Sequence, residues 1–113
     1  MKEQFEIWLV DLNPLRGTEP RKIRPVVVIQ TNLLNQVNHP STLICPITSQ
    51  ISQGENILRV RIAHKETGMD QLSEILIDQI RALDNRRFLE RLGKLDSEKA
   101  KEIQWKLKAT LDF

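Results

Sequence analysis

The stretch Arg24–Thr31, RPVVVIQT, decides the fold class. Its four consecutive β-branched residues, Val26–Ile29, are typical of a central strand buried on both faces, because such side chains pack well on a pleated surface. The preceding stretch, Asn13–Ile23 (NPLRGTEPRKI), carries two prolines, a glycine and several charges, and it indicates a long loop. Loops of this length without structure of their own are often functional. The sequence therefore predicts a β-rich protein with a basic loop leading into a core strand.

Other parts of the chain also indicate strands. Gln4–Leu12 (QFEIWLVDL) and Ile57–Ala63 (ILRVRIA) alternate with period two, and the second has arginines on one face. Ser41–Thr48 (STLICPIT) predicts a third strand, with Pro46 placing that end at a sheet edge or a bulge. Leu72–Asp84 supplies one or two more.

Helical patterns are few. Leu33–Pro40 predicts a short helical turn, and Arg86–Leu92 predicts another that ends at Gly93. From Asp96 to Phe113 the apolar residues recur at helical spacing, with Asp96 as the N-cap. We expect a single domain over residues 1–113 of the mostly β, α+β class: a strongly curved, barrel-like antiparallel sheet of five to six strands with a C-terminal helix.

Composition sets limits on function. The 113 residues carry a net charge of only +2, so any contact with nucleic acid must come from locally clustered charge. Cys45 is the one cysteine, which excludes an internal disulfide and fits a reducing cytosol. No apolar run is as long as a membrane span, and the N-terminus has a strand pattern and not that of a signal peptide. A cytoplasmic protein is expected.

Two segments could carry chemistry. In the basic loop, Arg24 stands at the mouth of the buried strand, where its planar guanidinium could bind phosphate oxygens. In the segment Pro46–Gln50 (PITSQ), hydroxyl and amide groups collect at a strand end and could donate to a phosphate or a base edge. A solvated basic loop explains the first pattern at least as well, and ordinary turn chemistry is the commoner explanation of the second. His39, His64 and Cys45 lack ligand spacing, so no metal or other cofactor is expected.

Four motifs occur in register: EIWLVDLNP from Glu6, then G-x-E-x-x-x-x-R-P-V-V-V from Gly17, then PITSQ, then DQIRALD from Asp78. With them, nearly the whole chain resembles the MazF/PemK family of toxin endoribonucleases from type II toxin–antitoxin systems. The resemblance implies an SH3-like barrel shared with the CcdB gyrase poisons. It also implies a homodimer that cuts single-stranded RNA without a metal. A cognate antitoxin would fill the substrate groove with its acidic C-terminal segment, and the toxin–antitoxin complex would bind DNA.

The resemblance assigns roles to individual residues. The family's catalytic arginine matches Arg24, its catalytic threonine matches Thr48, and its loop glutamate matches Glu19. The PemK branch has an Arg-x-Asp pair on a late strand; here Asp78 matches but Leu76 replaces the arginine, so the chain is closer to the MazF branch. The expected RNA-binding residues are Arg16, Gly17, Arg21, Lys22, Ser49, Gln50, Asp78 and Gln79.

The implied reaction is attack by a ribose 2′-hydroxyl on the adjacent phosphorus, giving a 2′,3′-cyclic phosphate and a 5′-hydroxyl. Arg24 and Thr48 would stabilise the phosphorane oxygens. Glu19 would accept the proton or orient Arg24, and the orienting role is favoured because an unperturbed glutamate titrates well below neutrality. Two alternatives are a CcdB-like gyrase poison and a non-catalytic module that binds RNA or antitoxin. The joint occurrence of Gly17, Glu19, Arg24 and Thr48 argues against the module.

Overall fold

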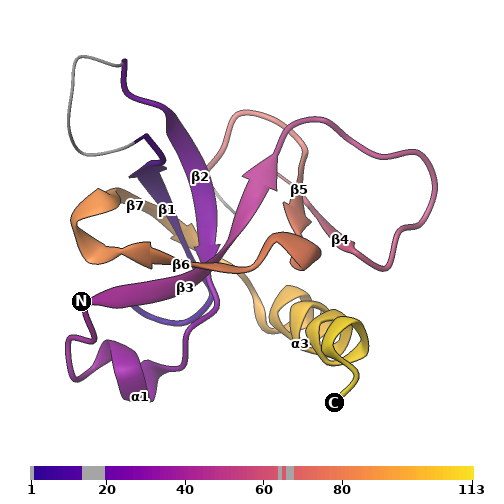
Figure 1. The fold of residues 1–113 in the computed structure, drawn as a ribbon. Coiled ribbons are helices and arrows are strands. Elements are labelled where there is room, and N and C mark those ends of the chain that lie inside the picture. The colour runs from indigo at the N-terminus through magenta and orange to yellow at the C-terminus, as the bar shows by residue number, and fades with distance from the viewer. Residues whose placement is uncertain (1, 14–19, 64, 66–67) are drawn as a thin grey trace.

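The computed structural model describes residues 2–13, 20–63, 65 and 68–113 (Figure 1). Its strands are β1 (Glu6–Asp11), β2 (Ile23–Val28), β3 (Ser41–Thr48), β4 (Arg59–Ile62), β5 (Ser73–Leu76), β6 (Arg81–Asp84) and β7 (Phe88–Lys94). Its helices are α1 (Asn32–Asn35) and α3 (Ser97–Leu111), with the 3-10 turns η1 (Ile77–Gln79) and η2 (Asn85–Arg87). The strands and helices expected from the sequence are confirmed for β1 to β6, α1 and α3.

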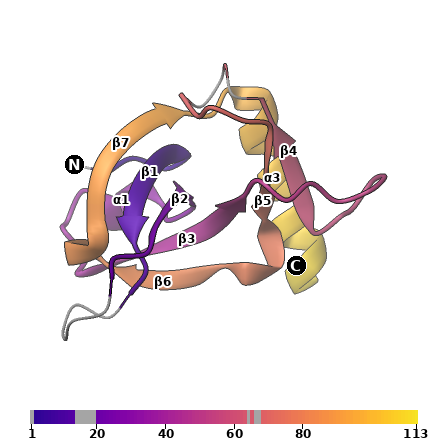
Figure 2. The same ribbon diagram turned by 90° about the horizontal axis from the view of Figure 1, so that it is seen from above.

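The described strands form one seven-stranded antiparallel sheet in the order β4-β5-β3-β2-β1-β7, with β6 paired to β3 off this path. Seen from above, the sheet curls round on itself, and α3 lies against the β4–β5 end (Figure 2). The expected α+β fold, a curved antiparallel barrel with a C-terminal helix, is confirmed.

The helical turn expected at Arg86–Leu92 is wrong beyond its first residues. The 3-10 turn ends at Arg87, and Phe88–Lys94 is the strand β7, paired with β1 across a register with two irregularities. The Phe88 ring meets Trp8 of β1 edge-on, with centroids 5.9 Å apart. Pairing and packing against β1 thus override the local helical preference, and this strand explains why the expected count of five to six was too low.

Of the two places expected for Pro46, a sheet edge or a bulge, the edge is wrong, because β3 is a central strand. One side of β3 pairs with β2, where Pro46 is opposite Val26. The other side pairs with β6 over Ser41–Ile44 and with β5 from Ile47 onward. Cys45 and Pro46 therefore lie where β3 changes partners, a place where a residue without an N–H interrupts no continuous ladder.

The core explains how α3 is attached. Buried apolar side chains from β1 to β5 and η1 pack with Ile103, which is fully buried. Asp96 caps the helix by accepting a hydrogen bond from the Lys99 N–H at 2.9 Å. Along the expected apolar stripe, Leu107 packs on the core edge, whereas Leu111 is 49% exposed.

Among the described residues no helix is long and apolar enough to cross a membrane.

Candidate active site

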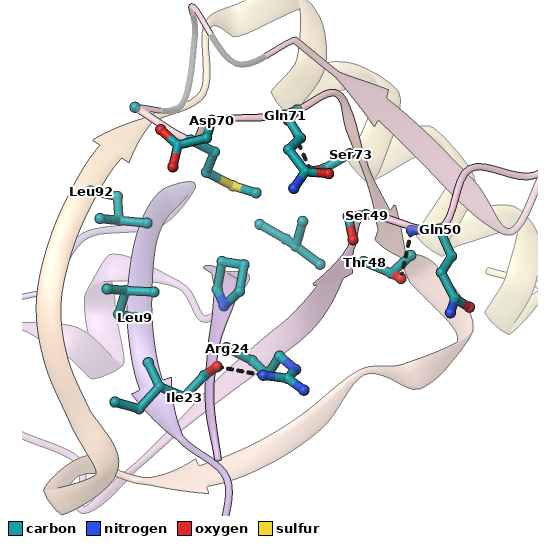
Figure 3. Close-up of a pocket in the computed structure, with 14 residues that line it drawn as sticks. Leu9, Ile23, Arg24, Thr48, Ser49, Gln50, Asp70, Gln71, Ser73 and Leu92 are labelled. Carbon is teal, nitrogen blue, oxygen red and sulfur yellow. Dashed lines mark hydrogen bonds between the residues drawn. The ribbon is translucent and has the colours of Figure 1, made fainter. Parts of the chain in front are cut away.

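A pocket of about 560 Å³ opens at the end of the sheet where β2 begins and β3 finishes (Figure 3). Arg24 and Ile23 lie on one rim, and Thr48, Ser49 and Gln50 lie on the adjoining rim (Figure 3). The full lining is Leu9, Ile23, Arg24, Pro25, Ile47, Thr48, Ser49, Gln50, Gly68, Met69, Asp70, Gln71, Ser73 and Leu92. The two segments singled out in the sequence thus meet in space.

Arg24 is held by the strand that follows it. Val26, Val27 and Val28 are fully buried, and Arg24 pairs with Val10 of β1 in the ladder. The backbone is therefore fixed, while the side chain is exposed and its Nη1 donates to the Ile23 carbonyl at 2.8 Å. Most of its donors face the pocket or solvent, and an arginine remains positively charged at any working pH. Such a group suits an anionic ligand.

Thr48 ends β3 and is paired on one side with Glu74 of β5, while the ladder with β2 ends two residues earlier, at Pro46. Its Oγ1 accepts a hydrogen bond from the Gln50 N–H at 3.1 Å. Because that bond uses only a lone pair, the hydroxyl hydrogen is still available to donate to a ligand. Ser49 and Gln50 follow it as exposed residues on the same rim.

The two stems of the loop between β1 and β2 are joined by Asp11. Its carboxylate accepts from the backbone N–H groups of Asn13 and Lys22, each at 3.1 Å, and from Arg21 Nε at 3.3 Å. The pKa of Asp11 is lowered, chiefly by the hydrogen bond from the Asn13 N–H. Partial burial acts in the opposite direction, and the Lys22 N–H and Arg21 lower the pKa further. Arg21 is thus held in an ion pair while 61% exposed, and the Lys22 side chain is exposed. These two predicted RNA-binding residues directly precede β2, whose first residues, Ile23 and Arg24, line the pocket.

Not every predicted site residue can be placed. Glu19, Arg16 and Gly17 lie outside the described residues. Asp78 and Gln79 are exposed in η1 and do not line the pocket. Their roles stay predictions.

Sequence reasoning missed the rim formed by Asp70, Gln71 and Ser73, which faces Arg24 across the pocket (Figure 3). Asp70 and Gln71 precede the strand predicted from Leu72, and Ser73 lies within it, so neither pattern pointed to a site. This stretch reaches the site because β5 pairs with the last residues of β3, so the segment before β5 is brought beside Thr48. A polar, glycine-containing stretch just before a buried strand was the available signal, and it was indistinguishable from an ordinary turn.

Arg59 and Arg61 share one face of β4. Both form ion pairs with the buried carboxylate of Glu74, at 3.0 and 3.2 Å. Within the described ranges, no three His, Cys, Asp or Glu side chains come together as a metal site would require.

Solved structures share this curved, barrel-like fold. MazF from Deinococcus radiodurans is 26% identical with a TM-score of 0.75, covering 99% of this chain and 97% of that one. A MazE–MazF complex from the same organism is 28% identical with a TM-score of 0.64, and the match covers 80% of this chain and 83% of that one.

Sequence comparison identifies the family. The model of the PemK-like, MazF-like toxins of type II toxin–antitoxin systems matches residues 3–111. The protein named endoribonuclease MazF from Staphylococcus saprophyticus is 36% identical over 103 residues, covering 91% of this chain and 85% of its own. The chain belongs to the PemK-like, MazF-like toxin family.

Proposed function

We propose that this MazF-type endoribonuclease, one domain over residues 1–113, cleaves single-stranded RNA in the pocket between Arg24 and Thr48. The observation that carries the proposal is their meeting in one pocket, because they are the two residues that match the family's catalytic arginine and threonine. Both side chains present unused donors there.

The ribose 2′-hydroxyl attacks the neighbouring phosphorus, and the bond from phosphorus to the 5′-oxygen breaks. The products are a 2′,3′-cyclic phosphate and a 5′-hydroxyl. Negative charge that builds on the non-bridging oxygens is stabilised by the Arg24 guanidinium and by a hydrogen bond from the Thr48 hydroxyl. Losing one such donor costs on the order of 3 kcal/mol, or about 100-fold in rate. Glu19 orients Arg24, since an ordinary glutamate is a weak base at neutral pH.

The remaining rims of the pocket bind the substrate. Ser49 and Gln50 offer hydroxyl and amide groups beside Thr48. On the far rim the Asp70 carboxylate repels phosphates, so it suits amino groups on base edges and keeps the RNA backbone on the Arg24 side. Arg21 and Lys22 attract the backbone as it enters.

The partners follow from the same site. A cognate antitoxin occupies the groove with an acidic segment, as expected for a type II system, and complexes of MazE with MazF are among the similar solved structures. We also propose that the toxin is a cytoplasmic homodimer and that its antitoxin complex binds DNA. Sedimentation of the purified toxin measures the first of these, and a monomer at micromolar concentration would contradict it.

The test is cleavage of a long single-stranded RNA transcript in the presence of a chelator, with both new ends mapped. We expect 2′,3′-cyclic phosphate and 5′-hydroxyl ends. Arg24→Ala and Thr48→Ala should each lower the rate by about 100-fold. Matched controls are Arg81→Ala and Thr110→Ala, which remove exposed side chains that do not line the pocket.

A requirement for divalent metal, 3′-hydroxyl products, or full activity of either pocket variant would contradict the proposal. A gyrase supercoiling assay run in parallel separates it from the gyrase-poison alternative, which predicts inhibition of gyrase and intact RNA.

A further inference from the structure

Glu74 is a buried acid for which neither the fold nor the proposed reaction accounts. It lies in β5, its side chain is only 3% exposed, and a charge taken out of water this fully is costly unless it is well paired. We propose that Glu74, together with Arg59 and Arg61, is the positioning unit that holds Thr48–Gln50 at the RNA-cleavage pocket. The proposal rests on the function proposed above.

The carboxylate of Glu74 is bonded to two groups of partners. From the segment after β3, Ser52 donates its backbone N–H at 2.8 Å and its hydroxyl at 3.1 Å. From β4, Arg59 Nη1 donates at 3.0 Å, and Arg61 donates through Nε at 3.3 Å and Nη2 at 3.2 Å. One acid thus joins the β4 arginines to the chain that leaves the active site.

The two arginines also bind that departing chain directly. Arg59 Nη1 donates to the Gln50 carbonyl at 3.0 Å, and Arg61 Nη2 donates to the Ser52 carbonyl at 3.0 Å. Gln50 is the residue whose N–H binds Thr48 Oγ1. The contacts therefore run from Glu74 through Arg59 to Gln50 and on to the Thr48 hydroxyl.

Ser49, Gln50 and Ile51 are exposed and belong to no strand. The bonds from Arg59 to the Gln50 carbonyl and from Arg61 to the Ser52 carbonyl therefore hold a stretch of backbone that the sheet does not pair. A pocket whose donor must meet a developing charge depends on such fixing, since a displacement of about 1 Å can cost on the order of 100-fold in rate.

The charge on Glu74 is secure at any working pH. Burial alone would raise its pKa, but the Ser52 N–H, Arg59, the Ser52 hydroxyl and Arg61 outweigh it and hold the pKa at about 2. Glu74→Gln keeps the size of the side chain and removes the charge, which makes it the test variant.

The matched control is Glu6→Gln. Glu6 is also a buried carboxylate, 5% exposed, and it accepts from an arginine, Arg91, at 2.6 Å. Its other donors are Trp8 Nε1 and the Glu3 N–H, and neither residue lines the pocket. Glu6→Gln loses one ion pair with an arginine and Glu74→Gln loses two, and only the arginines paired with Glu74 contact the chain beyond Thr48.

The experiment measures kcat and KM on a fluorogenic RNA oligonucleotide that contains the strongest mapped cleavage site, at a temperature where urea titration shows every variant folded. We expect Glu74→Gln to lower kcat roughly 10- to 100-fold with KM changed by less than about three-fold. Glu6→Gln should retain the kcat of the unmodified toxin. The proposal is overturned if the kcat of Glu74→Gln lies within about two-fold of the kcat of Glu6→Gln.

A double-variant cycle with Thr48→Ala tests the route. If Glu74 acts by placing Thr48, then Glu74→Gln costs much less in the Thr48→Ala background than alone, whereas additive losses refute this. Failure of the proposed function would look different: the unmodified toxin would leave RNA intact, or Thr48→Ala would keep its full rate.

Discussion

Gly68 offers the most direct test of how closely the pocket wall is packed. Its φ of +70° lies in the left-handed region, and a Cβ added there would stand 2.8 Å from the Leu92 carbonyl oxygen. Both residues line the pocket. Because the obstacle is backbone and not a flexible side chain, Gly68→Ala must shift β7 or the segment before β5.

Gly54 provides a matched control. It has the same φ of +70°, but an added Cβ would meet nothing within 4 Å. An alanine in the left-handed region costs about 1–2 kcal/mol, and both variants incur this cost. The collision at Gly68 adds about 1 kcal/mol or more, the order of a bond-angle distortion of several degrees. Gly68→Ala should therefore lose about 2–3 kcal/mol and Gly54→Ala about 1–2 kcal/mol.

Urea unfolding of both variants measures the difference as a lower midpoint with an unchanged slope. The RNA-cleavage rate, taken where both proteins are folded, should fall for Gly68→Ala and hold for Gly54→Ala, because only the first displaces a pocket wall. Equal losses of stability in the two variants would show that the contact with Leu92 is relieved without cost, and the reasoning would fail.

Three further predictions concern the core, acid stability and the loop. Ile103→Ala should cost about 2–5 kcal/mol in a urea titration, whereas Leu111→Ala, at a half-exposed site, should cost less than about 1 kcal/mol; similar losses would mean that α3 is not anchored at its middle. The pKa of Glu74 is depressed from 4.5 to about 2, so its stabilisation is complete above about 4.5 and is lost as the pH falls toward 2. The stability advantage of the unmodified toxin over Glu74→Gln should thus shrink over that range, and a constant difference would refute the pairing. Asp11→Asn weakens the hydrogen bonds that join the two stems of the loop. It should raise KM for RNA by about ten-fold, which corresponds to the loss of one charged hydrogen bond, while the control Asp84→Asn should leave KM unchanged. Equal effects of the two variants on KM would show that the loop stems do not contribute to RNA binding.

The sequence predicted what local pattern and side-chain chemistry determine. Arg24 was found because it stands one residue, Pro25, before a run of β-branched residues, and Val26–Val28 of that run are the buried half of β2. Thr48 was found because hydroxyl and amide residues collect at a strand end. The meeting of Arg24 and Thr48 in one pocket was expected only through the family resemblance.

What could not be predicted depends on contacts between distant segments. Phe88–Lys94 becomes a strand through pairing with β1, which no local pattern records. In the sequence, Glu74 is a single glutamate within an apolar stretch, and nothing distinguishes it from an exposed strand residue. Its burial between two arginines follows from the register of β4 against β5. Asp70 reached the site for the same reason, through the pairing of β5 with β3.

The place where β3 changes partners holds the chain's one cysteine. Cys45 is fully buried, and burial, reinforced by the negative charge of Asp78, raises the pKa of its thiol to about 12. Because only a thiolate attacks alkylating reagents, this sulfur is inert while β3 stays in the sheet. Its labelling rate therefore measures how often the strand that carries Thr48 opens. Antitoxin or RNA that binds the folded state should therefore slow the labelling of Cys45, and the tighter the binding, the slower the labelling.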